Sequence, residues 1–129
     1  MSVPLLSSIG LVMLALGTVS GWVLEAYHRW PQWFKRRGVI RLAPLRQTHL
    51  DWIVMSLMLF AIDQVVPERP GWITGLIAYG AIVNPLLFLP LAFDGPGNKR
   101  PVMQVALFTS FGSLTIAMPA LAVHGLTLG

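Results

Sequence analysis

Four long apolar stretches, separated by short polar connections, dominate the chain. They cover about residues 3–27, 49–66, 71–93 and 101–124. As α-helices, stretches of this length suffice to cross a hydrocarbon layer about 30 Å thick. The pattern therefore predicts four transmembrane helices in a single domain over residues 1–129. The expected fold is an all-α, integral membrane four-helix bundle.

Turn-forming residues mark the ends of these stretches. Two prolines follow the second stretch, and a turn-rich segment over residues 94–100 follows the third. The longest polar connection covers residues 28–48, where we expect Pro31 and Pro44 to interrupt any continuous helix.

The composition agrees with a membrane location. The chain is 55% hydrophobic and 11% charged, whereas about a quarter of the residues in a soluble domain are charged. The sequence contains no cysteine, so a disulfide framework and a thiolate metal site are both excluded. A metal or a haem would have to be bound by histidine, methionine or carboxylate side chains.

Positive charges are concentrated in the predicted connections. Of the nine lysine and arginine residues, six lie in the first connection, one in the second and two in the third. We therefore expect the first and third connections to be cytoplasmic and both termini to face the other side, in a bacterial inner membrane. Because the charges flank apolar stretches, they do not indicate nucleic-acid binding.

Small and aromatic residues add two expectations. Glycines at several positions should allow close helix approach, namely Gly10, Gly17, Gly21, Gly75 and Gly80. Four short helices make a thin bundle, so we expect a homo-oligomer in contact with the lipid bilayer. Four aromatic residues near the end of the first stretch are expected to be anchors at the membrane interface: Trp22, Tyr27, Trp30 and Trp33.

Polar residues within the second stretch follow a helical spacing. His49, Ser56 and Asp63 recur every seven residues, which places them on one face of a helix, and we expect this face to look into the bundle. His49 has two open interpretations, an interfacial side chain exposed to water or a functional group. Asp51 is interpreted as a carboxylate in the first turn of the helix, where the helix dipole favours a negative charge.

Asn84 lies well inside the third stretch, about 14 Å along the helix axis from its cytoplasmic end. A buried amide needs hydrogen-bond partners. Two interpretations remain open, an interhelical hydrogen bond that holds the helices together or a contact with a substrate or cofactor. Pro85 follows directly, so we expect a freed backbone carbonyl and a kink near this residue.

Other polar residues give weaker indications. Glu25 and His28 have the Glu-x-x-His spacing of di-iron helical bundles. Such a site needs more carboxylates at the same depth, and Asp51 is the only one there, so this spacing alone does not predict a di-metal site. His124 lies near the C-terminus, where we expect it to be solvated. Three polar residues of the fourth stretch can serve in packing or in a pocket: Gln104, Ser110 and Ser113.

Three segments together resemble a known family. They are the glycine-spaced run from Ile9 to Gly21, the segment Thr48-His49-Leu50-Asp51 at the opening of the second helix, and the segment from Tyr79 to Asn84, which reads Tyr-Gly-x-x-x-Asn. The chain resembles the small four-helix membrane isomerases that include hydroxylaminobenzene mutase and styrene oxide isomerase. The resemblance covers roughly 100 of the 129 residues, with the same order of spans and loops.

This resemblance implies a cofactor and two site residues. It implies that His49 is the axial ligand of a haem b, whose ferric iron acts as a Lewis acid and opens an epoxide to an aldehyde without net redox change. It also implies that Asn84 orients the substrate or the cofactor as a catalytic residue. Three polar positions of the family are apolar in this chain: Ile9, Met55 and Phe88.

Two functions follow as expectations. The first is a membrane-embedded isomerase or mutase that rearranges a small apolar aromatic or epoxide-like substrate taken from the bilayer. The alternative is a non-catalytic membrane protein, an assembly partner or a ligand binder, that keeps only the fold.

Overall fold

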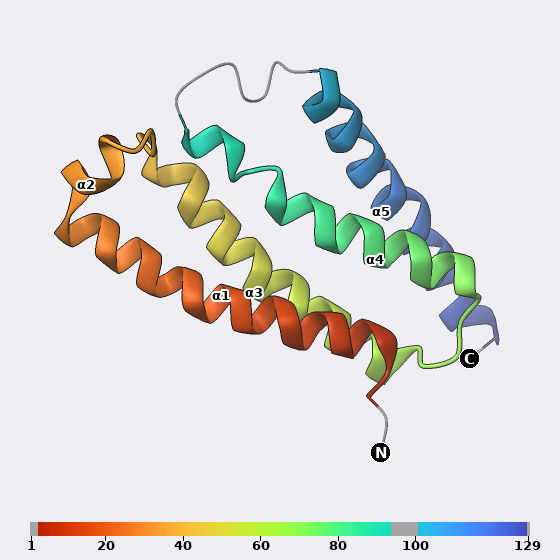
Figure 1. The fold of residues 1–129 in the computed structure, drawn as a ribbon. Helices are drawn as coiled ribbons and strands as arrows, with labels where there is room; N and C mark the ends of the chain where they lie inside the picture. The colour runs from red at the N-terminus through yellow and green to blue at the C-terminus, as the bar shows by residue number, and fades with distance from the viewer. Residues whose placement is uncertain (1–2, 94–100, 129) are drawn as a thin grey trace.

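The computed structural model describes residues 3–93 and 101–128 as a set of helices. In chain order these are α1 (Leu5–Arg29), α2 (Pro31–Lys35), α3 (Leu42–Val65), α4 (Gly71–Leu86), the 3₁₀ helix η1 (Pro90–Ala92) and α5 (Pro101–Leu128). The four long helices lie side by side, with α1 against α3 and α4 against α5 (Figure 1). The predicted all-α fold class is thus confirmed.

Three helices have the length and composition of membrane spans. They cover Leu5–Arg29, Gly71–Ala92 and Pro101–Thr127, which agrees with an integral membrane protein in contact with lipid. Helix α3 is not among them. Its 24 residues extend about 36 Å, but three of its side chains, His49, Asp51 and Asp63, lower its hydropathy.

The second long helix begins earlier than the sequence pattern predicts. Helix α3 starts at Leu42, seven residues before His49. Pro44 occupies the third position of the helix, where a backbone N–H would have no partner within the helix, so a proline is tolerated there. The expectation that Pro44 interrupts the helix is wrong, whereas the chain does break before Pro31, which begins α2.

The third long helix ends before the predicted residue 93. Regular α-helix stops at Leu86, and turns followed by η1 carry the chain on to Ala92. Pro85 has no N–H to donate to the preceding turn, which favours this ending. The Thr48 hydroxyl, buried on α3, donates a hydrogen bond to the Pro85 carbonyl oxygen at 3.1 Å. The α-helix thus ends directly after Pro85, while the predicted kink and freed carbonyl stay predictions.

Glycines bring the paired helices into close contact. A Cβ atom at Gly10 would lie 2.8 Å from Phe60 Cε1 of α3. On α4, a Cβ atom at Gly80 would lie 2.5 Å from Leu114 Cγ of α5. A Cβ atom at Gly75 would have no other atom within 4 Å, so the expected close approach at that glycine is wrong.

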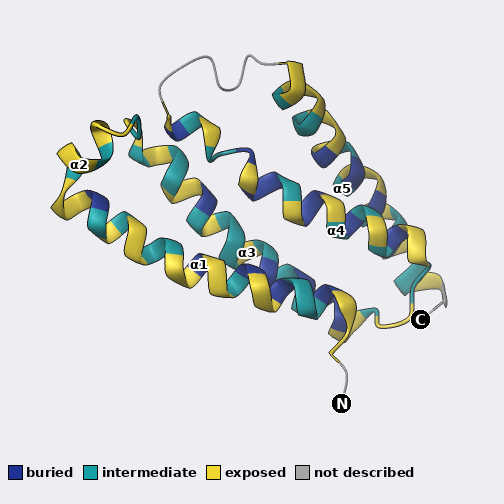
Figure 2. Cartoon of the chain, in the orientation of Figure 1, coloured by how far each residue is buried: buried dark blue, intermediate teal, exposed yellow. Residues whose placement is uncertain are grey.

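The hydrophobic core lies toward one end of the helices. It takes residues from the first half of α1, the last part of α3, the first part of α4 and the second half of α5. Exposed residues occur along all four long helices (Figure 2). Many of them are large and apolar, as expected of surfaces that face lipid. The members of the core are Leu6, Met13, Leu59, Ile62, Ile73, Ile77, Ala81, Ala117 and Leu121.

The other end of the helices carries α2 and most of the basic residues, and we call it the basic end. Here the backbone N–H groups of Ile40 and Arg41 both donate to the Ala92 carbonyl oxygen, at 2.9 and 3.1 Å. The Arg41 guanidinium donates to the carbonyl oxygens of Leu91 and Phe93, at 3.1 and 2.7 Å. The first connection is thus held to η1 by hydrogen bonds.

Candidate functional site

A cavity of about 190 Å³ lies between the C-terminal part of α4, with the turn that follows it, and the first half of α5. Its walls are mostly apolar. They are formed by Asn84, Leu87, Phe88, Leu91, Met103, Gln104, Leu107 and Phe111. Phe88, one of the three apolar residues at positions that are polar in the resembled family, adds to the apolar wall.

Asn84 is the buried polar residue of this cavity. Only 7% of the residue is exposed. Its Nδ2 donates a long hydrogen bond of 3.4 Å to Asp51 Oδ2 of α3. Its Oδ1 is buried and has no hydrogen-bond partner among the described residues. Because a buried carbonyl oxygen without a partner is costly, this atom marks the cavity as a candidate binding site.

Asp51 supports Asn84, a role that the sequence pattern did not indicate. The Gln47 side chain, one turn earlier on α3, donates from Nε2 to Asp51 Oδ1 at 3.0 Å. A hydrogen-bonded chain therefore runs from Gln47 through Asp51 to Asn84. The interpretation of Asp51 as a first-turn carboxylate is wrong, because α3 begins nine residues earlier, about two and a half turns away.

His49 packs against α1, on the opposite side of α3 from Asn84. Its Nδ1 lies 2.7 Å from the Gly17 carbonyl oxygen and 2.9 Å from Ser20 Oγ. A carbonyl oxygen only accepts hydrogen bonds, so Nδ1 carries the proton and Nε2 of the neutral ring keeps a lone pair. A Cβ atom at Gly21 would lie 3.2 Å from His49 Cε1, so only a glycine leaves the ring this space.

The face of α3 that carries His49, Ser56 and Asp63 looks into the protein, as the seven-residue spacing predicts. Ser56 is fully buried against α1 near Gly10. His49 is half-buried, so it is not simply an interfacial side chain in water. No hydrogen bond joins His49 to Asn84 in the described part of the chain, where the structure pairs Asn84 with Asp51 instead.

Asp63 belongs to a second polar cluster, at the end of the helices that holds the core. Arg69 Nη2 donates to Asp63 Oδ1 at 2.6 Å, and the two side chains are only 6% and 5% exposed. The backbone N–H and the hydroxyl of Ser7 donate to Asp63 Oδ2, at 2.7 and 2.6 Å. Arg69 also donates to Thr74 Oγ1 and the Val66 carbonyl oxygen. Since the two charges are paired and bonded to α1 and α4, this cluster joins helices.

The Glu-x-x-His spacing does not form a metal site. Glu25 pairs with Arg29 at 2.9 Å, both side chains being largely exposed, and His28 Nδ1 lies 2.9 Å from the Leu24 carbonyl oxygen. No group of three or more potential ligands gathers anywhere in residues 3–93 and 101–128. His124 is half-buried and hydrogen-bonds through Nε2 to the Glu68 carbonyl oxygen at 2.9 Å, in an exposed contact, so its expected solvation stays a prediction.

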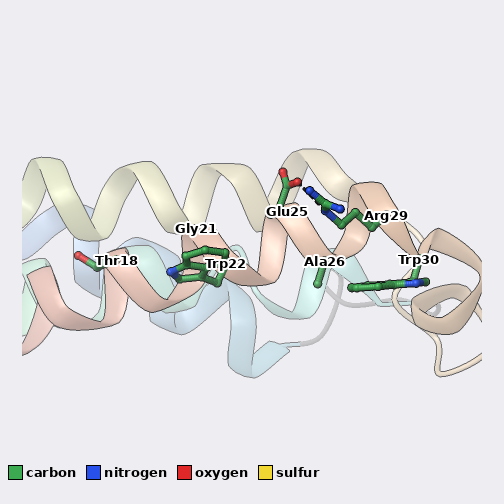
Figure 3. Close-up of a pocket in the computed structure, with 7 residues that line it drawn as sticks. All are labelled: Thr18, Gly21, Trp22, Glu25, Ala26, Arg29 and Trp30. Carbon is green, nitrogen blue, oxygen red and sulfur yellow. Dashed lines mark hydrogen bonds and ion pairs between the residues drawn. The ribbon is translucent and has the colours of Figure 1, made fainter.

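A larger hollow than the cavity beside Asn84 lies on the outer face of α1. Its volume is about 740 Å³. Figure 3 shows the Glu25–Arg29 ion pair on one side of this helix, with the Trp22 and Trp30 rings on the other side. Both tryptophans are highly exposed, as interface anchors should be. Because the charges of this hollow are already paired, we place the candidate site at Asn84. The hollow is lined by Thr18, Gly21, Trp22, Glu25, Ala26, Arg29 and Trp30.

Two further expectations from the sequence are resolved. Tyr27 is buried and contacts Phe34 of α2, with ring centroids 5.2 Å apart, so it is not an exposed anchor. Ser110 and Ser113 are buried in the contact between α4 and α5. Ser110 Oγ lies 3.4 Å from the Gly80 carbonyl oxygen, which gives these serines a packing role.

Comparison with known proteins adds no family. No protein-family model, no curated protein and no solved structure matches the chain. The resemblance to the small membrane isomerases therefore stays a prediction, and the function has to be argued from the site itself.

Proposed function

We propose that this chain is a membrane-embedded isomerase that binds a small apolar molecule in the cavity beside Asn84 and rearranges it. The observation that carries the proposal is the buried Asn84 Oδ1, which has no partner in the described residues and belongs to an otherwise apolar cavity. Polar groups at membrane depth are costly and are typically functional. Asp51, itself held by Gln47, keeps the amide in place.

The proposal includes α3 as a fourth span, with the basic end in the cytoplasm. Its length of 24 residues suffices to cross the bilayer. Three polar side chains farther along the helix than Arg46 contact another helix or connection: His49 contacts α1, Asp51 contacts α4, and Asp63 contacts α1 and Arg69. Satisfied in this way, polar side chains are compatible with a membrane interior.

The resemblance also implies haem b, and the surroundings of His49 fit an axial ligand. A histidine that binds a metal through one ring nitrogen almost always donates a hydrogen bond from the other. His49 has this arrangement, because Nδ1 donates to Gly17 and Nε2 remains an acceptor, while Gly21 leaves space beside the ring. When bound there, on the other side of α3 from the cavity beside Asn84, a ferric haem would supply Lewis acidity. Ser20 and the Gly17 carbonyl would fix the ring orientation.

The haem part of the proposal is tested by the absorption spectrum. We expect the purified protein, supplemented with haem, to show a Soret band that His49→Ala shifts or removes. His124→Ala is the matched control, because this histidine lies at the opposite end of the helices, and it should leave the band unchanged. A wild type without a Soret band, or an unaltered band in His49→Ala, would contradict haem ligation by His49.

Rearrangement is tested with an aryl hydroxylamine and an aryl epoxide. We expect the purified protein to convert one of them into a product of unchanged mass, and Asn84→Leu to lose this activity. If neither is converted, the non-catalytic alternative is favoured, in which the protein binds a small molecule or assembles with a partner.

A further inference from the structure

We infer that the cavity beside Asn84 selects a neutral, single-ring molecule that carries a hydrogen-bond donor, such as a phenol or an arylamine, over a molecule that carries only acceptors. The inference rests on the proposed role of Asn84 as the substrate contact, but it requires neither haem nor catalysis. It narrows the expected substrate class, because an epoxide oxygen accepts hydrogen bonds and donates none.

The orientation of the Asn84 amide follows from its neighbours. An ionised Asp51 only accepts hydrogen bonds, so the Asn84 group that faces it is then the amide NH₂. The contact from Asn84 Nδ2 to Asp51 Oδ2 agrees with this requirement. A flipped amide would place its carbonyl oxygen against the carboxylate, which is repulsive. The carbonyl oxygen is therefore the group left for a ligand, and it needs a donor.

Gln47 supports this orientation of the Asn84 amide. Its Nε2 donates to Asp51 Oδ1, so each carboxylate oxygen of Asp51 accepts one amide. The amides of Gln47 and Asn84 thus both donate to the Asp51 carboxylate, which lies between them. An asparagine at position 51 would break this symmetry, because its carbonyl oxygen would accept from Gln47 and its NH₂ would face Asn84. The Asn84 amide would then flip and present its own NH₂ to the cavity.

The size and the walls of the cavity select the ligand class. Its volume is about 190 Å³, and an apolar cavity of about 150 Å³ in another protein binds benzene. A single ring with one small substituent therefore fits. None of the described residues that line the cavity is charged, so a neutral ligand is favoured. Gln104 is the other polar lining residue, but it is exposed, so hydrogen bonding matters most at the buried Asn84.

Two probes of similar shape test this inference. 4-Fluorophenol carries an O–H donor, whereas 4-fluoroanisole carries only an acceptor oxygen. Binding of each to the full-length protein in detergent is followed by ¹⁹F NMR, and the ratio of the two affinities is compared between variants. Each probe partitions into the detergent to the same extent with every variant, so this partitioning cancels when the affinity ratios are compared. We expect Asn84→Leu to lower the preference for the phenol by about tenfold, the typical effect of one buried hydrogen bond.

Asp51→Asn is the sharper variant. It keeps the size of the side chain, and we expect it to reverse the preference, so that the anisole binds better than the phenol. Gln104→Leu is the matched control, since it removes the other polar lining residue, and it should change the ratio by less than about twofold.

Three outcomes would overturn the inference. They are an unchanged ratio in both Asn84→Leu and Asp51→Asn, a loss of the preference in Gln104→Leu alone, and the absence of binding of either probe to the wild type. The result is separable from the proposed function. A preference for the phenol without a Soret band or turnover would support the binding site and contradict the isomerase function. Turnover without this preference would support the isomerase function and contradict the inferred ligand selectivity.

Discussion

Asp63 and Arg69 form a buried ion pair whose hydrogen-bonding groups contact three helices and a connection. Removing one member of such a pair leaves a buried charge without compensation, which costs about 3–5 kcal/mol. We expect Asp63→Ala to lower the free energy of unfolding by about this amount, measured by thermal unfolding in detergent. The double variant Asp63→Ala with Arg69→Met should be more stable than Asp63→Ala alone. Equal stability of the two would show that Arg69 reaches solvent without Asp63.

Contacts between residues that lie far apart along the chain could not be predicted from the sequence. Asn84 was singled out as a buried amide, and its two interpretations could not be separated because Asp51 lies 33 positions earlier on another helix. The sequence pattern places the start of the second helix after Pro44, which puts Asp51 in its first turn. Pro44 instead lies in the first turn of α3, so Asp51 is farther inside the helix. A signal for the second cluster was present in the opposite charges of Asp63 and Arg69, six positions apart around a proline-containing turn.

At the level of helices, the glycines of α4 allow a matched comparison. Alanine is favoured over glycine inside a helix by about 1 kcal/mol at either position. At Gly80 the added Cβ atom would lie 2.5 Å from Leu114 Cγ and 2.9 Å from Ser113 Oγ, and overpacking of this kind costs about 1–3 kcal/mol. We therefore expect Gly80→Ala to lower the midpoint of thermal unfolding and Gly75→Ala to raise it slightly. A rise in both variants would mean that α5 shifts away at little cost.

Helix positions were predictable where apolar length alone decides them, as in α1 and α5. The boundaries of α3 and α4 were not, because proline has different effects at different helix positions. Pro44 lies in a first turn and is tolerated, while Pro85 lies near the end of α4 and contributes to its termination. The glycine spacing predicted close approach at Gly10 and Gly80 but did not reveal that Gly75 faces open space.

At the level of the whole molecule, the chain lacks cysteine, so single introduced cysteines report its sidedness. Arg36 follows α2 and Glu68 lies in the connection between α3 and α4, and both are exposed. If α3 spans the membrane, a membrane-impermeant maleimide should label Glu68→Cys in intact cells and Arg36→Cys only in inverted vesicles. Labelling of both from the same side would show that α3 does not span.

The two ends of the helices are held together by different forces. Far from α2, apolar side chains from all four long helices pack against one another. At the basic end, the hydrogen bonds from Thr48 to Pro85 and from Ile40 and Arg41 to η1 join the two helix pairs. The Thr48–Pro85 hydrogen bond is buried, whereas Ile40 and Arg41 are exposed, so water can compete for the hydrogen bonds between the first connection and η1.

The cavity beside Asn84 is separate from the apolar core. It lies between α4, with the turn that follows it, and α5, and none of its described lining residues is a member of the core. A small molecule could therefore fill the cavity, or leave it, without any change in the packing that holds the four long helices together.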